Sequence, residues 1–395
     1  MEVGEVVRRY GASFFVEQSQ HLSLTQRKVL AAMALCCTPA MGAHLQRCDH
    51  CGREVLLCNS CGDRHCPKCQ NAKRAVWFEK RRQDLLPVEY FHVVFTVPEE
   101  LNVLAAAHPR VFYDLLLRAV RETLVDVAAT PRHLGGQIGG LMVLHTWGQN
   151  LWLHPHVHLI VPGGAISPDG QQWLACPRGF FLPVKVLSRV FRGKLLDYLQ
   201  RAHKAGKLPM TDGQAPLNNP RQFARFISQL YKIEWVVYAK PPMTGGPEKI
   251  LKYLSRYVHR IAISNDRLES IENGEVTFRY KDYSRGNCWR RMTLPAGEFL
   301  RRLSQHILPR GFVRVRAFGF LANGHRTKKL ALIRKLLNVT NPSALPDPPA
   351  EKASEVTSRC PHCGKPALRA VSCTVRPLVV DMIARTYLAA PFDTS

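Results

Sequence analysis

The segment GLMVLHTWGQNLWLHPHVHLIVPGG, residues 140–164, decides the fold of this 395-residue chain. It contains two runs rich in aliphatic and aromatic residues, 140–148 and 151–164, and the polar pair Gln149-Asn150 separates them. Two such runs with a short polar connection predict an antiparallel β-hairpin.

Three histidines in the second run, His154, His156 and His158, are spaced two residues apart. A strand directs alternate side chains to opposite faces, so all three imidazoles share one face. The apolar side chains of the run then face the other way: Leu153, Val157, Leu159 and Val161. Aligned imidazoles form a candidate metal site, for either a zinc hydrolase with an activated water or a divalent ion that polarises a phosphate. The histidines alone do not choose between these chemistries.

The rest of the pattern predicts an α+β protein with a small metal module in front of a larger body. We expect further strands at 90–98, 235–240 and 275–283, and helices at 108–129, 184–207 and 248–262. The predicted organisation is an N-terminal helical segment (1–46), a zinc-binding module (47–75), a catalytic domain (76–340), a Pro-rich linker (341–358) and a C-terminal tail with a Cys-x-x-Cys pair (359–395).

Six of the 13 cysteines lie between residues 48 and 69. They include two Cys-x2-Cys pairs, Cys48 with Cys51 and Cys66 with Cys69, and this spacing is typical of tetrahedral zinc sites. We predict one structural zinc ion on these four thiolates, with no coordination position left for catalysis. Two residues between the pairs are further candidate ligands: Cys61 and His65.

The net charge is +25, from 55 Lys and Arg against 30 Asp and Glu. Such an excess indicates an anionic partner, and the basic residues beside the cysteine pairs, including Arg64 and Lys68, make nucleic acid the expected one. No apolar stretch approaches the roughly 18 residues of a membrane span, and no apolar segment follows a basic N-terminus. We therefore expect a soluble, unexported protein without a membrane partner.

Two tyrosines in the predicted helix 248–262, Tyr253 and Tyr257, are four residues apart and share one helix face. Basic residues surround them: Lys252, Arg256 and Arg260. A phenol has an ordinary pKa near 10 and is a weak nucleophile unless it is deprotonated or held against a polarised electrophile. Neighbouring cations favour the phenolate and attract phosphate.

These features together resemble the insertion sequence 91 family of rolling-circle transposases, which are two-tyrosine HUH endonucleases (His, hydrophobic residue, His). The resemblance covers most of residues 10–335, in order along the chain. It is carried by CDHCG, NSCGDRHCPKCQ, YFHVVFTVP, HTWGQNLWLHPHVH, KYLSRYVHRIAISN, FRYKDYSRG and HILPRGFVRVRAFGFLANGHR. It implies an HUH-endonuclease-like antiparallel sheet with packed helices, preceded by a zinc-ribbon-like module.

The resemblance also implies that His156 and His158, with a third polar side chain, bind Mg2+ or Mn2+. His154 is the third ligand expected from strand register, and Gln149 and His145 are the alternatives. Imidazole ligands suit Mn2+ better than Mg2+.

By the same resemblance, Tyr253 and Tyr257 are the nucleophiles that cleave single-stranded DNA at the element ends and join it to target DNA through a 5′-phosphotyrosine. The chain has no G-x4-G-K-[ST] loop, so we expect a host helicase to separate the strands. The expected location is the bacterial cytoplasm, in association with the nucleoid.

Two other functions remain open from the residues: a zinc-finger DNA-binding regulator, in which the histidines and tyrosines are structural, and a zinc-dependent hydrolase built on His154, His156 and His158. In the tail, Cys360, Cys363 and Cys373 lack a clear fourth thiolate, so we expect a degenerate site in preference to a second zinc site. The cysteines outside both groups are expected to be structural: Cys36, Cys37, Cys176 and Cys288.

Overall fold

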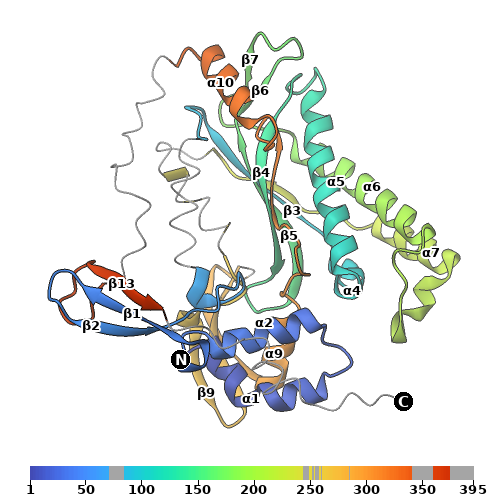
Figure 1. Ribbon diagram of the computed structural model, residues 1–395. Coiled ribbons are helices and arrows are strands. Elements are labelled where there is room, and N and C mark those ends of the chain that lie inside the picture. Colours follow the sequence, from blue (N-terminus) through green and yellow to red (C-terminus); the bar gives the residue numbers. More distant parts are fainter. Residues whose placement is uncertain are drawn as a thin grey trace.

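Antiparallel sheets and packed helices make up the α+β architecture that the sequence predicts (Figure 1). The computed structural model describes residues 1–70, 84–242, 249–250, 253, 258, 260–283, 285–339 and 359–373. The predicted linker 341–358 and most of the predicted helix 248–262 lie outside these ranges. No helix in the described ranges has the length and hydropathy needed to cross a membrane.

The central sheet has five strands in the order β12-β4-β5-β3-β8. Their bounds are Val315–Gly319 (β12), Gly139–Trp147 (β4), Leu153–Pro162 (β5), Tyr90–Thr96 (β3) and Val237–Ala239 (β8). The predicted hairpin is confirmed, because β4 and β5 pair antiparallel on both sides of the turn that contains Gln149 and Asn150. β5 also pairs with β3, so the histidine strand is the middle strand of the sheet.

Helices cover one face of this sheet (Figure 1). They are α4 (Asn102–Ala107), α5 (Pro109–Ala129), α6 (Val184–Lys204) and α7 (Pro220–Leu230). Odd-numbered residues of β5 and β3 enter the core beneath them; for example, the ring of Phe95 lies 5.1 Å from that of Phe191 on α6. The even-numbered residues, including His156 and His158, consequently occupy the opposite face.

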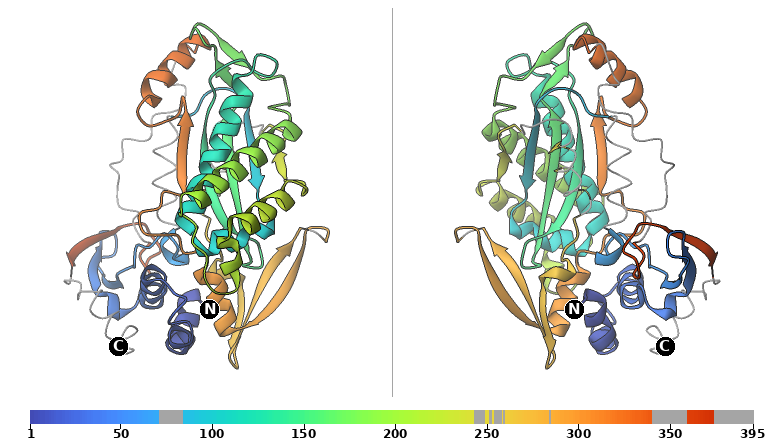
Figure 2. Two further views of the ribbon diagram at one scale, coloured as in Figure 1. Left: turned by 90° about the vertical axis from the view of Figure 1, so that its right-hand side faces the viewer. Right: turned by 90° about the vertical axis from the view of Figure 1, so that its left-hand side faces the viewer.

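A second core joins the N-terminal helices to residues 262–307. It contains the N-terminal helices α1 (Val3–Glu17) and α2 (Leu24–Leu35), the helix α9 (Ala296–Ser304) and a three-stranded sheet. This sheet has the order β11-β10-β9, with bounds Cys288–Pro295, Glu275–Asp282 and Leu268–Glu272. It projects beside α9 in the side views (Figure 2). The N-terminal helices thus pack against residues more than 200 positions away.

A third sheet, with the order β13-β1-β2, has the bounds Leu368–Cys373, Ala43–Cys48 and Glu54–Cys58. Strands from opposite ends of the chain lie side by side in it, β1 in blue and β13 in red (Figure 1). Helical structure near the N-terminus therefore ends well before residue 46, because residues 43–48 find strand partners on both sides. The remaining elements of the described ranges are β6 (Gly164–Ile166), β7 (Trp173–Ala175), α10 (Arg326–Leu336) and 3-10 helices at Pro39–Met41, Glu99–Leu101, Asp212–Asn218 and Asn265–Arg267.

The second core gives a test of how α1 is held. Phe14 is buried in this core, whereas Val16 on the same helix is 64% exposed. We expect Phe14→Ala to lower the free energy of unfolding by about 3–5 kcal/mol, because a buried ring is replaced by a cavity. Val16→Ala should change it by less than about 0.5 kcal/mol. Urea unfolding measures both, and hydrogen exchange should show lost protection in β10 and α9 for Phe14→Ala alone. Equal effects of the two substitutions would contradict this packing.

Candidate functional site

Three histidines converge on the face of the central sheet opposite the helices. His145 comes from β4, and His156 and His158 come from β5. One ring nitrogen from each lies within 4.8 Å of the others. The β4–β5 register places His145 directly across from His156, and the His145 and His158 ring centroids are 4.5 Å apart. This spacing suits three ligands of one ion.

His154, the third ligand expected from strand register, is not in this group. Its ring centroid lies 5.2 Å from that of His156, and the side chain is exposed. Same-face neighbours along a strand are about 6.6–6.8 Å apart, so His154 and His158 are separated by roughly 13 Å of strand. A cross-strand neighbour is only about 4.5–5.5 Å away, which is why His145 completes the triangle. Gln149, the other alternative, lies in the turn, where its main-chain oxygen accepts a hydrogen bond from Arg267.

The strand histidines are held in the neutral form. Burial lowers the pKa of His156 to about 3. Burial, followed by the proximity of His145, lowers the pKa of His158 further. Neutral imidazole is the form that binds metal ions, so these rings carry an available lone pair at neutral pH.

A fourth histidine, His92 on β3, connects this group to Tyr253. Its Nε2 atom lies 2.8 Å from Nδ1 of His158, and its Nδ1 atom lies 2.9 Å from the Tyr253 hydroxyl oxygen. Sequence reasoning missed His92. The signal was present, because His92 interrupts the apolar run of β3 at a position that shares a face with the β5 histidines.

Cations lie beside this chain of contacts. The Lys240 ammonium is 3.4 Å from the Tyr253 hydroxyl oxygen and can donate a hydrogen bond to it. Arg260 is close enough that its charge helps to lower the pKa values of His156 and His158. The other predicted residues of this region, Tyr257, Lys252 and Arg256, lie outside the described residues.

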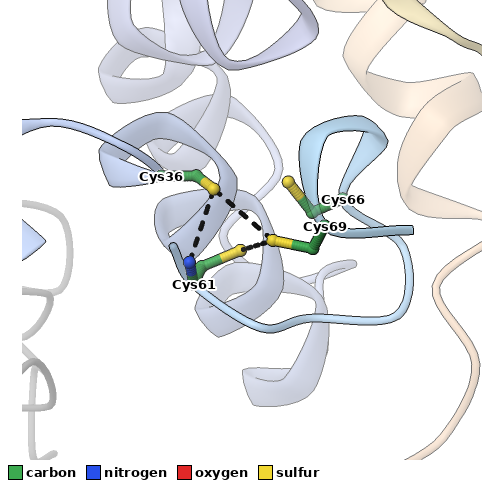
Figure 3. Close-up of side chains that lie close together, drawn as sticks. All are labelled: Cys36, Cys61, Cys66 and Cys69. Atoms are coloured by element: carbon green, nitrogen blue, oxygen red, sulfur yellow. Dashed lines mark hydrogen bonds between the residues drawn. The ribbon is translucent and has the colours of Figure 1, made fainter. Parts of the chain in front are cut away.

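The cysteines form two clusters where the sequence predicts one. In the first cluster, Cys36 at the end of α2 lies with Cys61, Cys66 and Cys69 (Figure 3). Its Sγ atoms are 3.6 Å apart for Cys36–Cys69 and for Cys61–Cys69. Two thiolates that share a tetrahedral zinc ion at about 2.3 Å are expected roughly 3.8 Å apart. The four thiols therefore suit one structural zinc ion.

The other predicted ligands, Cys48 and Cys51, lie in the second cluster with Cys360 and Cys363. The predicted grouping of both Cys-x2-Cys pairs around one ion is thus corrected. The reason is the β1–β2 hairpin, which has Cys58 at its base, opposite Ala43, and the Cys48–Cys51 turn at its tip. Base and tip are separated by about 13–16 Å at 3.3 Å per residue, so one ion cannot reach both pairs.

Cys36 was expected to be structural and instead belongs to the first cluster. Its position ahead of the module was the signal available in the sequence. Cys61, Cys66 and Cys69 lack a fourth thiol only once the structure places Cys48 and Cys51 elsewhere. His65, a candidate ligand, is used otherwise: Nδ1 lies 2.8 Å from Asp63, and Nε2 accepts a hydrogen bond from the Leu308 amide.

Arg64 and Lys68, both predicted to bind DNA, make contacts within the chain. The Arg64 guanidinium donates to the main-chain oxygens of Pro309 and Phe312. The Lys68 ammonium lies 2.7 Å from the Glu2 carboxylate. In this structure both side chains connect the zinc module to its neighbours.

Two family models and two relatives match this chain. Residues 139–329 match a family model described as "Putative transposase", and residues 6–97 match one described as "Transposase zinc-binding domain". The chain is 49% identical over 372 residues to "Putative transposase y4qJ" of Sinorhizobium fredii, covering 92% of each protein. It is 29% identical over 345 residues to the transposase for insertion sequence element IS801 of Pseudomonas savastanoi pv. phaseolicola, covering 85% of this chain and 81% of that protein.

No solved structure matches the chain. Both matched regions and both relatives lead to one conclusion: the chain belongs to the insertion sequence 91 family of transposases.

Proposed function

We propose that this transposase nicks and rejoins single-stranded DNA at the element ends through a 5′-phosphotyrosine intermediate. Tyr253 is one nucleophile, and His145, His156 and His158 hold a divalent ion. The observation that carries the proposal is the contact chain from the Tyr253 hydroxyl through His92 to His158. It joins a candidate nucleophile to a candidate metal ligand through two short contacts.

The three imidazoles fit a divalent ion by their spacing and by their neutral form. Mn2+ suits imidazole better than Mg2+, and availability in the cell decides between them. Such an ion, when bound, polarises the scissile phosphate and orients it. The protein's own side chains supply the nucleophile and the hydrogen bonds that stabilise it.

In this proposal His92 donates a hydrogen bond to the Tyr253 oxygen. When Nε2 of His158 is the ligand atom, the His158 ring carries its proton on Nδ1 and donates a hydrogen bond to Nε2 of His92. The neutral His92 ring then has its proton on Nδ1, where it donates to the Tyr253 oxygen. Lys240 donates to the same oxygen, so both neighbours stabilise negative charge on it.

In the cleavage step the Tyr253 oxygen attacks the phosphorus atom, and the bond from phosphorus to the 3′-oxygen breaks. The phenolic proton passes to water, because His92 and Lys240 both donate to the tyrosine oxygen, and the leaving 3′-oxygen takes a proton from water to become a 3′-OH. The 5′-phosphate remains on tyrosine. The phosphodiester energy is retained in this bond, so the reverse attack by a 3′-OH joins strands without ATP. Tyr257 is the second nucleophile of the proposal, used for a second cleavage or for strand transfer.

The DNA contacts follow from the charge distribution. Lys240 and Arg260 lie beside the histidines and attract the backbone of a single strand, with an affinity that falls as salt rises. The proposal places the protein on bacterial DNA in the cytoplasm, with a host helicase supplying the single strand for rolling-circle transposition. Target DNA enters the same site for joining.

The tyrosines are tested with single-stranded oligonucleotides from the element ends and Mn2+. A 3′-label should appear on the protein, because the 5′-phosphate stays on tyrosine, whereas a 5′-label should appear in a shortened free strand. We expect the double variant Tyr253→Phe, Tyr257→Phe to abolish the protein-linked band in denaturing electrophoresis. Tyr238→Phe, which changes an exposed tyrosine on β8, is the matched control and should retain it.

A protein-linked band that persists in the double variant would exclude these nucleophiles. Sequence-specific DNA binding with no adduct from wild-type protein would favour the zinc-finger regulator. Turnover of a small substrate without an adduct would favour the zinc-dependent hydrolase.

The histidine group is tested by comparing His145→Ala with His154→Ala. We expect His145→Ala to weaken Mn2+ binding by at least the 10–100-fold typical of losing an outer-shell partner, and to reduce cleavage with it. His154→Ala should leave both nearly unchanged, because His154 lies outside the group. Calorimetry with Mn2+ measures the affinity. A larger loss of Mn2+ affinity in His154→Ala than in His145→Ala would instead support His154, His156 and His158 as the ligands.

A further inference from the structure

Two short segments from opposite ends of the chain have almost the same sequence and lie together. They are CDHCG, residues 48–52, and CPHCG, residues 360–364. The Sγ atoms of Cys48 and Cys363 are 3.7 Å apart, as are those of Cys51 and Cys360. All four Sγ atoms lie within 4.8 Å of one another.

The main chain of the two segments is also the same. The Gly52 amide donates to the Cys48 oxygen at 2.8 Å, and the Gly364 amide donates to the Cys360 oxygen at 2.8 Å. Both glycines have positive φ, +69° and +72°, a conformation that side chains disfavour. Each segment is therefore a tight turn that presents two thiols, and the two turns face one another.

The sulfur spacing identifies the chemistry. A disulfide requires about 2.05 Å between sulfurs, so the 3.7 Å separations exclude it. Ligands of one tetrahedral zinc ion are expected roughly 3.8 Å apart, which agrees. Four soft thiolates select zinc over harder cations and leave no position open for a substrate.

The neighbouring strands support the same arrangement. β13 pairs antiparallel with β1, from Cys48 opposite Leu368 to His44 opposite Cys373. The Asp49 amide donates to the Ala367 oxygen at 2.8 Å. The apolar cluster beneath is small, with Leu368, Val55 and Leu57 beside the cysteines. A unit with so little core depends on a bound metal to fold.

We infer that Cys48, Cys51, Cys360 and Cys363 bind a second structural zinc ion, which fastens the C-terminal segment 359–373 to the N-terminal hairpin. The tail cysteines are thus half of a complete site, whose other half lies more than 300 residues earlier. Neither matched region, 6–97 or 139–329, contains Cys360 or Cys363. The inference is independent of the proposed DNA chemistry.

Zinc counting in the full-length protein tests this site. Wild-type protein should carry two zinc ions per chain by native mass spectrometry and elemental analysis. Cys48→Ser with Cys51→Ser should remove one ion, and Cys360→Ser with Cys363→Ser should also remove one. The quadruple variant should still lose only one, because both pairs hold the same ion. Cys58→Ser, in the same hairpin but in neither cluster, is the matched control and should keep two.

Two outcomes would overturn the inference. The first is that the Cys360→Ser, Cys363→Ser variant still carries two zinc ions. The second is that the quadruple variant loses two ions while the thiols of the first cluster stay protected from alkylation, since the two pairs would then hold separate ions.

Alkylation of wild-type protein gives a second test that needs no variant. Cys51 and Cys288 are both exposed, so without a metal both should react readily. We expect Cys288 to be modified at once, and the four cysteines of the site to be protected until a chelator is added and then to react together. Reaction of Cys360 and Cys363 at the rate of Cys288 before chelation would contradict a metal at this position.

Discussion

The site depends on one constraint, which is that β5 is the middle strand of an antiparallel sheet with a different environment on each face. Its odd-numbered side chains enter the core under α5 and α6, and its even-numbered side chains include the histidines. A shift of one residue in register would place imidazoles in the apolar core, where burial without partners is unfavourable. The apolar face thus fixes which way His156 and His158 point.

The same register explains how two further residues reach the site. β4 brings His145 opposite His156, and β3 brings His92 next to His158. Each strand contributes an alternating position, so the imidazoles share one face, although the β4–β5 register shifts immediately after His145, between His145 and Trp147. Ile250 and Tyr253 cover part of this face near Ile160, which brings the phenol to His92. Packing against the sheet therefore sets the distance between the proposed nucleophile, Tyr253, and the proposed metal ligands.

Period-two and period-3.6 patterns were sufficient to predict the hairpin, the helices over the core face and the orientation of His156 and His158. They were not sufficient to choose His145 over His154, because that choice depends on distances between strands. His92 was not predicted as a site residue for the same reason, because its position beside His158 depends on the pairing of β3 with β5. The shared core of α1, α2 and α9 was also beyond local patterns, because its partners are far apart in sequence.

For the cysteines, the Cys-x2-Cys spacing indicated metal binding but did not indicate which pairs lie in the same cluster. Each Cys-x2-Cys turn indicates two ligands, but the rigid hairpin separates Cys48 from Cys66, so each pair must find thiols elsewhere. Closing a loop of 315 residues to Cys363, compared with 18 to Cys66, costs only about 2.5 kcal/mol more because the penalty grows with the logarithm of length. Zinc binding by thiolate sites supplies about 10–16 kcal/mol. Sequence distance is thus a weak barrier, and strand geometry decides which thiols meet.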